Sequence, residues 1–287
     1  MTKILVCGAK GQLGSSFREL ETENRNFSFD FTDIEELDIL DLVSLNIYVK
    51  ETNPDYVINC AAYTLVDKAE TDREKAFLLN AEAANNLLIA SHHCHARLIH
   101  ISTDYVFNGR AHSPYKETDL PDPDSVYGLS KLKGEMYLAD DDSAIIIRTS
   151  WLYSNFGHNF LKTVLRLGSE RPEIRMVFDQ IGTPTYAGDL AEAILQIIKK
   201  SEQSSSAFKS GVYHYSNEGV ASWYDFAKEI VDLGGLKTKT LPIETFEYPL
   251  PAPRPQYSVL NKRKIRDTFG ITIRHWKDAL VECMGKS

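Results

Sequence analysis

The first half of the chain alternates short apolar runs with longer stretches in which apolar residues recur at helical spacing. Residues 41–51 and 73–93 predict amphipathic helices. The apolar runs predict strands at residues 3–8, 27–31, 55–63, 96–102 and 144–150. Because these strands are apolar almost throughout and alternate with helices, we expect a parallel sheet covered by helices on both faces, an α/β fold.

After residue 150 this rhythm loosens, and a polar loop occupies residues 199–211. We therefore predict a sheet domain at 1–150, with returning segments near 179–200, and a smaller α+β C-terminal domain at 151–287 that binds the substrate. The expected helices of this half lie at 159–168, 189–200, 223–235 and 273–284, and the expected strands at 174–178 and 212–216.

Three glycines follow the first predicted strand in the pattern G-x-x-G-x-x-G, and a helix is expected to begin within this loop. A dinucleotide pyrophosphate needs close backbone approach and the free N–H groups of a helix N-terminus, which such a loop provides. A plain tight turn is the alternative, but the position after a first strand favours a Rossmann-type doubly wound sheet. The expected cofactor-binding residues of this loop are Gly8, Gly11, Gln12, Leu13 and Gly14.

A carboxylate at the end of the second strand is expected to bind the adenosine ribose of the cofactor. Asp30 and Asp33 both compete for this role, and we prefer Asp33 because it lies just past the strand. An acid there repels a 2′-phosphate and favours NADH, while Lys10 in the glycine loop is a counterweight, so NADPH or NADH is expected. Asp38 and Ile39 are candidates for the adenine edge; an N-terminal cap of the next helix is the alternative for them.

Tyr127 and Lys131 are four residues apart in a predicted helix, which places them on the same helix face. An ammonium beside a phenol stabilises the phenolate and lowers the pKa of the tyrosine toward neutral pH. Such a phenol can exchange a proton with a carbonyl or alcohol oxygen. The spacing alone is common, so an ordinary surface helix is the alternative interpretation.

Charge and composition narrow the classes of partner. The 287 residues include 40 Asp and Glu against 32 Lys and Arg, a net charge of −8. This charge argues against nucleic acid and does not favour an anionic membrane surface. We also expect no signal peptide and no membrane span, since the chain starts on a strand and its apolar runs are short. The expected location is cytoplasmic.

The cysteines and histidines are not expected to bind metal. Cys7, Cys60, Cys94 and Cys283 fit no zinc spacing, and reduced thiols of a cytosolic protein are the simplest interpretation. The histidine-rich stretch 92–100 ends a predicted helix, where neighbouring side chains point in different directions and few can converge on one ion.

Four stretches together are more specific than any one of them. They are GAKGQLG (8–14), NCAAYTLVDKAE (59–70), ISTDYVFNG (101–109) and VYGLSKLKGE (126–135). In this order and spacing the chain closely resembles the extended short-chain dehydrogenase/reductase family. The segments RTSWLY (148–153), DQIGTPTY (179–186) and RPQYSVL (254–260) extend the resemblance to members that reduce the C4 ketone of a dTDP-sugar with NADPH or NADH.

The resemblance implies a role for each matching residue. Tyr127 would donate a proton to the C4 oxygen of the sugar, Lys131 would hold the nicotinamide ribose, and Thr103 would hydrogen-bond the same C4 oxygen. The segment after the third strand would lie along the cofactor, with Ala61, Ala62, Tyr63 and Thr64. The residues implied to bind the sugar nucleotide are Asp104, Trp151, Asn159 and Arg254. A core aromatic is the alternative for Trp151, and Arg254 suits a diphosphate because arginine forks to phosphate oxygens.

Three alternatives are weighed against this assignment. The 4,6-dehydratases of the family follow the threonine with Asp-Glu, whereas Thr103 is followed here by Asp104 and Tyr105, which disfavours dehydration. A 4-epimerase shares the tyrosine and lysine and stays open. A regulatory subunit resembling the β subunit of methionine adenosyltransferase needs no catalytic set, so the retention of Thr103, Tyr127 and Lys131 favours an enzyme.

Some members of the family are thought to dimerise around Mg²⁺ held by glutamates, one of them just after the glycine loop. That turn reads Ser15-Ser16-Phe17 here, and Gly188 replaces a second such glutamate. We therefore expect no metal site, and either a monomer or a homodimer is open.

Overall fold

A six-stranded parallel sheet forms the centre of the protein in the computed structural model, which describes residues 1–286. The strand order is β10-β5-β4-β3-β1-β2, and every neighbouring pair is parallel. From β1 the chain adds β2 on one side of the sheet and then β3, β4 and β5 on the other, so the strand order reverses between β1 and β3. This order confirms the predicted doubly wound α/β fold. The strands are β1 (Thr2–Cys7), β2 (Phe27–Thr32), β3 (Tyr56–Asn59), β4 (Arg97–Thr103), β5 (Ala144–Thr149) and β10 (Gly211–His214).

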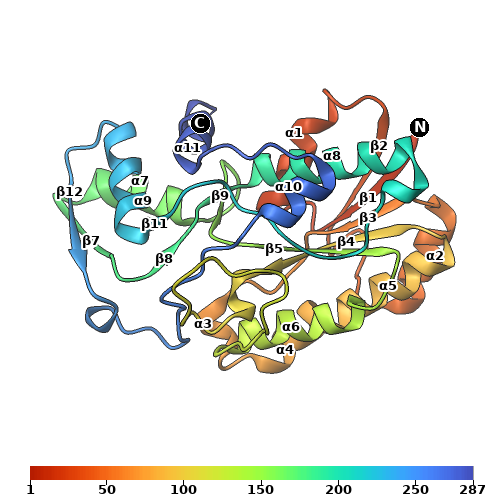
Figure 1. Ribbon diagram of the computed structural model, residues 1–287, viewed down its shortest axis with the longest axis horizontal. Helices are drawn as coiled ribbons and strands as arrows, with labels where there is room; N and C mark the ends of the chain where they lie inside the picture. The colour runs from red at the N-terminus through yellow and green to blue at the C-terminus, as the bar shows by residue number, and fades with distance from the viewer. Residues whose placement is uncertain (287) are drawn as a thin grey trace.

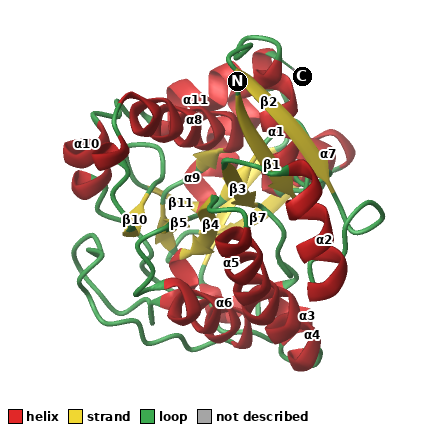
Figure 2. Ribbon diagram, turned by 90° about the vertical axis from the view of Figure 1, so that its right-hand side faces the viewer, coloured by secondary structure: helices red, strands yellow, loops and turns green. Residues whose placement is uncertain are grey.

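Helices cover both faces of the sheet (Figures 1 and 2). One face carries α1 (Gln12–Glu21), α8 (Ala187–Gln203) and α10 (Arg263–Phe269), and the other carries α2 (Leu42–Thr52), α5 (Ala83–His93) and α6 (Val126–Leu138). Each layer encloses its own apolar core, because strand side chains point alternately to the two faces. No helix among residues 1–286 is long and apolar enough to cross a membrane.

The helix predicted over residues 73–93 is divided by a π-helical turn. It consists of α4 (Arg73–Phe77), the turn η1 (Leu78–Glu82) and α5. The turn carries Asn80, whose amide accepts from the backbone N–H of Tyr63 at 2.8 Å and donates to its carbonyl at 3.1 Å. Asn80 also donates to Ser130 Oγ in α6 at 2.9 Å. Through these hydrogen bonds the turn fixes the segment after β3 against α6. Single π-helical turns of this kind are frequent at functional sites.

Beyond Trp151 the chain builds a second, smaller cluster of elements. Its core contains Tyr153, Phe226 and Trp276. Its helices are α7 (Phe160–Glu170), α9 (Trp223–Leu233) and α11 (Trp276–Gly285), which confirms the helices predicted there. Its strands form three pairs: β6 (Leu152–Tyr153) with β9 (Thr185–Tyr186), β7 (Glu173–Val177) with β12 (Lys239–Ile243), and β8 (Ile181–Gly182) with β11 (Ala221–Ser222).

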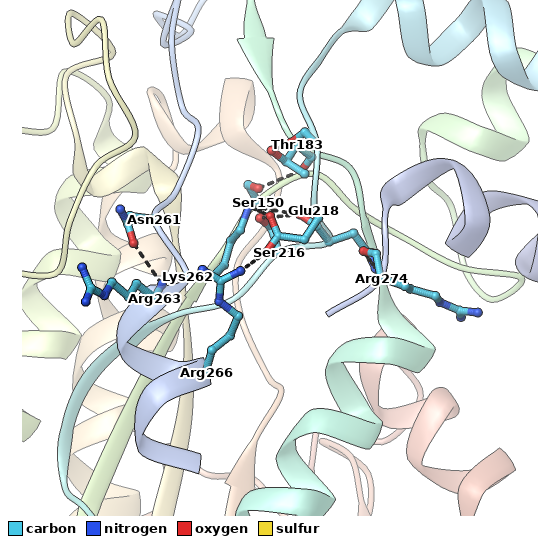
Figure 3. A network of polar contacts seen from close by, with 11 residues as sticks. Ser150, Thr183, Ser216, Glu218, Asn261, Lys262, Arg263, Arg266 and Arg274 are labelled. Atoms are coloured by element: carbon cyan, nitrogen blue, oxygen red, sulfur yellow. Dashed lines mark hydrogen bonds and ion pairs between the residues drawn. The ribbon is translucent and has the colours of Figure 1, made fainter. Parts of the chain in front are cut away.

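Two parts of the second half return to the sheet, since β10 pairs with β5 and α8 packs on α1. Figure 3 shows Lys262 and Arg266 converging on Glu218, which follows β10, with ion-pair distances of 3.2 and 2.9 Å. The buried Lys262 fixes α10 to the end of β10. The domain boundary at residue 150 stays a prediction.

Candidate active site

The glycine loop has the shape of an anion cradle. Gly8 has φ +78°, and a Cβ there would lie 2.6 Å from the backbone nitrogen of Ala61. A Cβ on Gly14 would lie 2.5 Å from the carbonyl oxygen of Gly8. Among the described residues, no side chain caps the N-terminus of α1, which begins at Gln12. The loop therefore offers backbone N–H groups with no side chain in the way, which suits a dinucleotide pyrophosphate.

The two candidate carboxylates for the ribose have different partners. Asp30 accepts a hydrogen bond from the Tyr48 hydroxyl at 2.8 Å, so its side chain is directed toward α2. Asp33 lies past β2 and accepts from the backbone N–H groups of Lys10 and Ile34, both at 2.9 Å. Its contact with Lys10 places this carboxylate against the glycine loop. The geometry therefore favours Asp33 over Asp30 for the ribose.

The predicted adenine-edge residues have local roles. Asp38 is exposed and accepts from the backbone N–H of Leu40 at 2.9 Å, while Ile39 is buried in the core beneath α2. Neither caps α2: that role belongs to Asp41, which accepts from Val43 and Ser44. The capping alternative for Asp38 and Ile39 is therefore wrong, and their contact with the adenine stays a prediction.

The segment after β3 lies against the glycine loop. The strand ends at Asn59, earlier than predicted, and the Asn59 side chain accepts from the backbone N–H of Ala61 at 3.1 Å. Tyr63 is buried, its hydroxyl donates to Asp72 at 3.1 Å, and its backbone N–H and carbonyl are both bonded to Asn80. Ala62 and Thr64 flank it, half-buried and exposed respectively. The backbone of Ala61 packs directly against Gly8, so this segment begins at the glycine loop.

Thr103, Tyr127 and Lys131 come together where β4 meets α6. Thr103 is the last residue of β4, and its hydroxyl lies close enough to the Tyr127 phenol to favour the phenolate form. Lys131 is 2% exposed, and its Nζ donates to the carbonyl oxygen of Ile101 in β4 at 2.5 Å. The ring of Tyr105 lies 5.5 Å from that of Tyr127, nearly perpendicular to it. The end of β4 therefore contacts both catalytic candidates of α6, Tyr127 and Lys131.

Electrostatics of this pair differ from the sequence-based expectation. Burial raises the pKa of Tyr127 to about 12, and the charge of Asp104 adds to the rise. Burial also lowers the pKa of Lys131 to about 8. The expected lowering of the tyrosine pKa by Lys131 is therefore not seen in the protein alone, because loss of water is the largest effect on the phenol. A tyrosine in this state is protonated at neutral pH and can act as an acid.

Asp104 lies beneath this pair rather than at the surface. It is 2% exposed, and Thr103 Oγ1 donates to its Oδ1 at 3.1 Å. Burial raises the pKa of Asp104 to about 6, against the opposing effect of nearby donors such as the Thr103 hydroxyl. The predicted sugar contact would therefore have to be made by a carboxylate that already accepts a hydrogen bond from Thr103.

Trp151 has an unusual backbone for a tryptophan, with φ +47°. Its indole stacks on that of Trp223 with ring centroids 3.5 Å apart and planes within 5°. A Cβ on Gly182 would lie 2.5 Å from the same indole. Trp151 packs against the core of the smaller cluster, as the core-aromatic alternative expects, and its contact with the sugar stays a prediction.

Arg254 reaches back to the segment that follows β3. Its Nη2 lies 2.6 Å from Oδ2 of Asp67 in α3 (Val66–Ala69), and its Nη1 donates to the Ala252 carbonyl at 2.9 Å. Arg254 also lowers the pKa of Tyr105, whose ring contacts Tyr127, against the larger opposing effect of burial. The guanidinium is therefore oriented by Asp67, a partner that the sequence did not predict, and its charge acts on Tyr105.

Asn159 has a structural task. Its Nδ2 donates to Gln12 Oε1 at 2.9 Å and to the carbonyl of Ser154 at 2.7 Å, while its Oδ1 accepts from Lys162 and caps α7. These contacts occupy the amide and oppose the predicted donation to the substrate. The contact with Asn159 also gives Gln12 a structural role, because it links the glycine loop to the second half of the chain.

Among residues 1–286, no group of three or more His, Cys, Asp and Glu side chains is arranged to hold a metal ion. His92 pairs with Asp141 at 2.8 Å and His93 with Asn46 at 3.0 Å, so the two side chains have separate partners. His100 is buried beside Asn59, and burial lowers its pKa well below the ordinary value. Glu282 forms ion pairs with Arg274 and with Lys286, so two side chains of the protein already balance the charge of this carboxylate.

Comparison with known proteins gives consistent relatives. The family described as "RmlD substrate binding domain" matches residues 1–287. The spore coat polysaccharide biosynthesis protein SpsK of Bacillus subtilis (strain 168) is 43% identical over 98% of this chain and 96% of its own. The dTDP-4-dehydrorhamnose reductase of Aggregatibacter actinomycetemcomitans is 39% identical over 98% of this chain and 97% of its own. The crystal structure of dTDP-4-dehydrorhamnose reductase from Bacillus anthracis in complex with NADP superposes with a TM-score of 0.94, at 38% identity and full coverage of both chains.

Proposed function

Because this chain belongs to the family of the RmlD substrate binding domain, we propose that it reduces the C4 ketone of dTDP-4-dehydro-L-rhamnose to dTDP-L-rhamnose in dTDP-rhamnose biosynthesis. NADPH or NADH supplies the hydride. The family lies within the extended short-chain dehydrogenases and reductases that the sequence motifs indicated. The observation that carries the proposal is the meeting of Thr103 and Tyr127 at the carboxyl end of β4, one helical turn from the anchored Lys131.

Tyr127 is the proton donor of the proposed reaction. Its raised pKa keeps the phenol protonated at neutral pH, so the proton is available as negative charge develops on the C4 oxygen. Thr103 supplies a second hydroxyl for the same oxygen, and removing one such donor typically slows a reaction about 100-fold. Lys131 holds the nicotinamide ribose and stabilises the phenolate that is left after proton transfer.

The remaining predicted residues divide between the two ligands. Gly8, Gly11 and Gly14 cradle the pyrophosphate, Asp33 binds the adenosine ribose, and the backbone of residues 61–64 lines the cofactor. Arg254 binds the diphosphate of the sugar nucleotide, and Trp151 contacts the sugar. This assignment corresponds to the proposed division into a cofactor domain at 1–150 and a sugar-nucleotide domain at 151–287. Its support is the cradle at Gly8 and the orientation of Arg254 by Asp67.

The proposed partner is the dTDP-sugar alone. The net charge of −8 supports a protein that needs neither nucleic acid nor an anionic membrane surface. The cytoplasmic location and the choice between monomer and homodimer stay predictions.

The test is a stoichiometric assay with purified protein, dTDP-4-dehydro-L-rhamnose and either reduced cofactor. We expect one molecule of reduced cofactor to be consumed for each molecule of dTDP-L-rhamnose formed. The sugar nucleotides are separated and quantified by chromatography. Interconversion of sugars without loss of reduced cofactor would identify an epimerase. Absence of any turnover, with cofactor binding intact, would favour a non-catalytic subunit.

A further inference from the structure

Glu135 continues the catalytic face of α6. Tyr127, Lys131 and Glu135 are successive i, i+4 positions, so the three side chains lie along one stripe of the helix. All three meet the end of β4: Tyr127 at Thr103, Lys131 at the carbonyl of Ile101, and Glu135 at the hydroxyl of Ser102. The catalytic stripe thus ends in a buried carboxylate to which the proposed reaction gives no role.

Arg148 holds this carboxylate in a two-point contact. Its Nε lies 3.0 Å from Oε1 of Glu135, and its Nη2 lies 2.6 Å from Oε2. Both side chains are 4% exposed. Arg148 is in turn fixed by the ring of Phe107, 5.1 Å from the guanidinium carbon, and by His214 Nε2 at 3.5 Å. Burying two charges is costly in water-free surroundings, so the pair calls for an explanation beyond stability.

Lys131 faces few other charged groups. From the end of β3, the thiol of Cys60 faces it, and burial raises the pKa of that thiol, which is therefore neutral. From β4, His100 faces it, with a pKa well below the ordinary value, and is also neutral. Tyr127 on the same helix is protonated. Burial lowers the pKa of Lys131, and the charge of Glu135, which forms the buried ion pair with Arg148, acts against that lowering.

We propose that Glu135, locked in place by Arg148, is a positioning residue that acts through Lys131: its negative charge keeps the buried ammonium protonated and docked on Ile101. The proposal rests on the proposed function, in which Lys131 holds the cofactor ribose. A neutral amine in this place would bind the ribose less well and would no longer stabilise the phenolate.

The sign of the expected effect is fixed. The pKa of Lys131 is about 8, so the ammonium is lost as pH rises through that value. Glu135→Gln removes the supporting charge and leaves the nearby Arg148 charge, so Lys131 should lose its proton at lower pH. Arg148→Met removes the opposite charge and leaves Glu135 with Ser102 and Lys131. A purely structural ion pair would weaken the fold in both variants alike, whereas the proposal expects different pH dependences.

The experiment measures binding of NADPH by fluorescence from about pH 6 to about pH 10, and kcat/KM over the same range. In the wild type, both should decline above about pH 8. In Glu135→Gln the decline should begin about one pH unit lower, while in Arg148→Met it should begin no lower than in the wild type. Lys131→Met should abolish the decline in binding.

Breaking a buried pair is strongly destabilising, so a second variant guards against poor folding of Glu135→Gln at the assay temperature. The double variant Glu135→Gln with Arg148→Met removes the uncompensated arginine. Its decline in cofactor binding should still begin at a lower pH than in the wild type. If the decline is unmoved in both Glu135→Gln and the double variant, the proposal is overturned. If the wild type binds cofactor but reduces no sugar, the proposed function fails, and the pH dependence of binding still decides the role of Glu135.

Discussion

Arg254 and Asp67 form an ion pair of 2.6 Å that joins the loop near the C-terminus to the helix after β3. The pair holds a guanidinium that is 16% exposed and whose charge acts on Tyr105. Because planar arginine recognises phosphate oxygens at two points, this geometry suits the diphosphate of a sugar nucleotide.

Arg254→Ala should therefore raise the KM for the sugar nucleotide about 10- to 100-fold, the loss expected for charge-assisted hydrogen bonds. The change in kcat should be smaller, because the diphosphate is remote from the reacting carbonyl. Arg263→Ala is the matched control, since Arg263 is exposed and paired with Asp267. Steady-state kinetics measure both, and an unchanged KM in Arg254→Ala would remove the diphosphate role.

Tyr127→Phe removes the acidic proton and keeps the ring. We expect kcat to fall at least ~100-fold, the scale of general acid catalysis, with little change in cofactor affinity. Tyr137→Phe is the control on the same helix, where the hydroxyl donates to Glu82 instead. A Tyr127→Phe enzyme that reduced the sugar at a near-normal rate would show that Tyr127 is not the proton donor.

Asp33→Ala tests the choice of nucleotide. Removing the carboxylate relieves repulsion of a 2′-phosphate, worth about 1 kcal/mol at about 4 Å in water, so the kcat/KM ratio should shift roughly fivefold toward NADPH. Asp30→Asn should leave the ratio unchanged, since that side chain is held by Tyr48. The kcat/KM ratio for NADPH over NADH is measured for both variants at the same ionic strength. A shift of this ratio in Asp30→Asn alone would assign the ribose to Asp30 in place of Asp33.

Asp104 should make the protein less stable as pH rises. Its pKa is 3.8 in the ordinary state and about 6 in the folded protein, so folding is favoured while it is protonated. The contribution is complete below about pH 4 and is lost as pH rises through about 6. Asp104→Asn should remove this dependence and raise the free energy of unfolding at pH 7 by up to about 3 kcal/mol.

Urea unfolding of wild type and variant at pH 5 and pH 8 measures this difference. The exposed Asp140 provides the control, because Asp140→Asn should leave the pH dependence of stability as it is. If the wild type and Asp104→Asn lose stability equally between the two pH values, burial does not perturb Asp104 as described.

The features that the sequence predicted well are those encoded by neighbouring residues. Continuous apolar runs predict buried parallel strands, and the glycine spacing predicts a turn that only small residues can make, as the close approach of Gly8 to Ala61 shows. The Tyr127–Lys131 interval likewise follows from helix geometry alone.

The features that were missed depend on contacts between distant segments. Asp67 gives no local sign of pairing with Arg254, and Trp223 gives none of stacking on Trp151. The strand β12 contains Pro242, which weakens its strand signal, yet its pairing with β7 fixes it. The raised pKa of Tyr127 was missed for the same reason, because burial is set by the whole fold and not by the spacing to Lys131.

The central claim is that hydride reaches C4 of the sugar once for each cofactor oxidised. Reduced cofactor carrying deuterium at nicotinamide C4, on the face that is transferred, tests it most directly when mixed with the enzyme and dTDP-4-dehydro-L-rhamnose. We expect one deuterium at C4 of the dTDP-L-rhamnose formed for each oxidised cofactor, measured by mass spectrometry and NMR. A product without deuterium at C4, or a changed sugar with the cofactor still reduced, would contradict it.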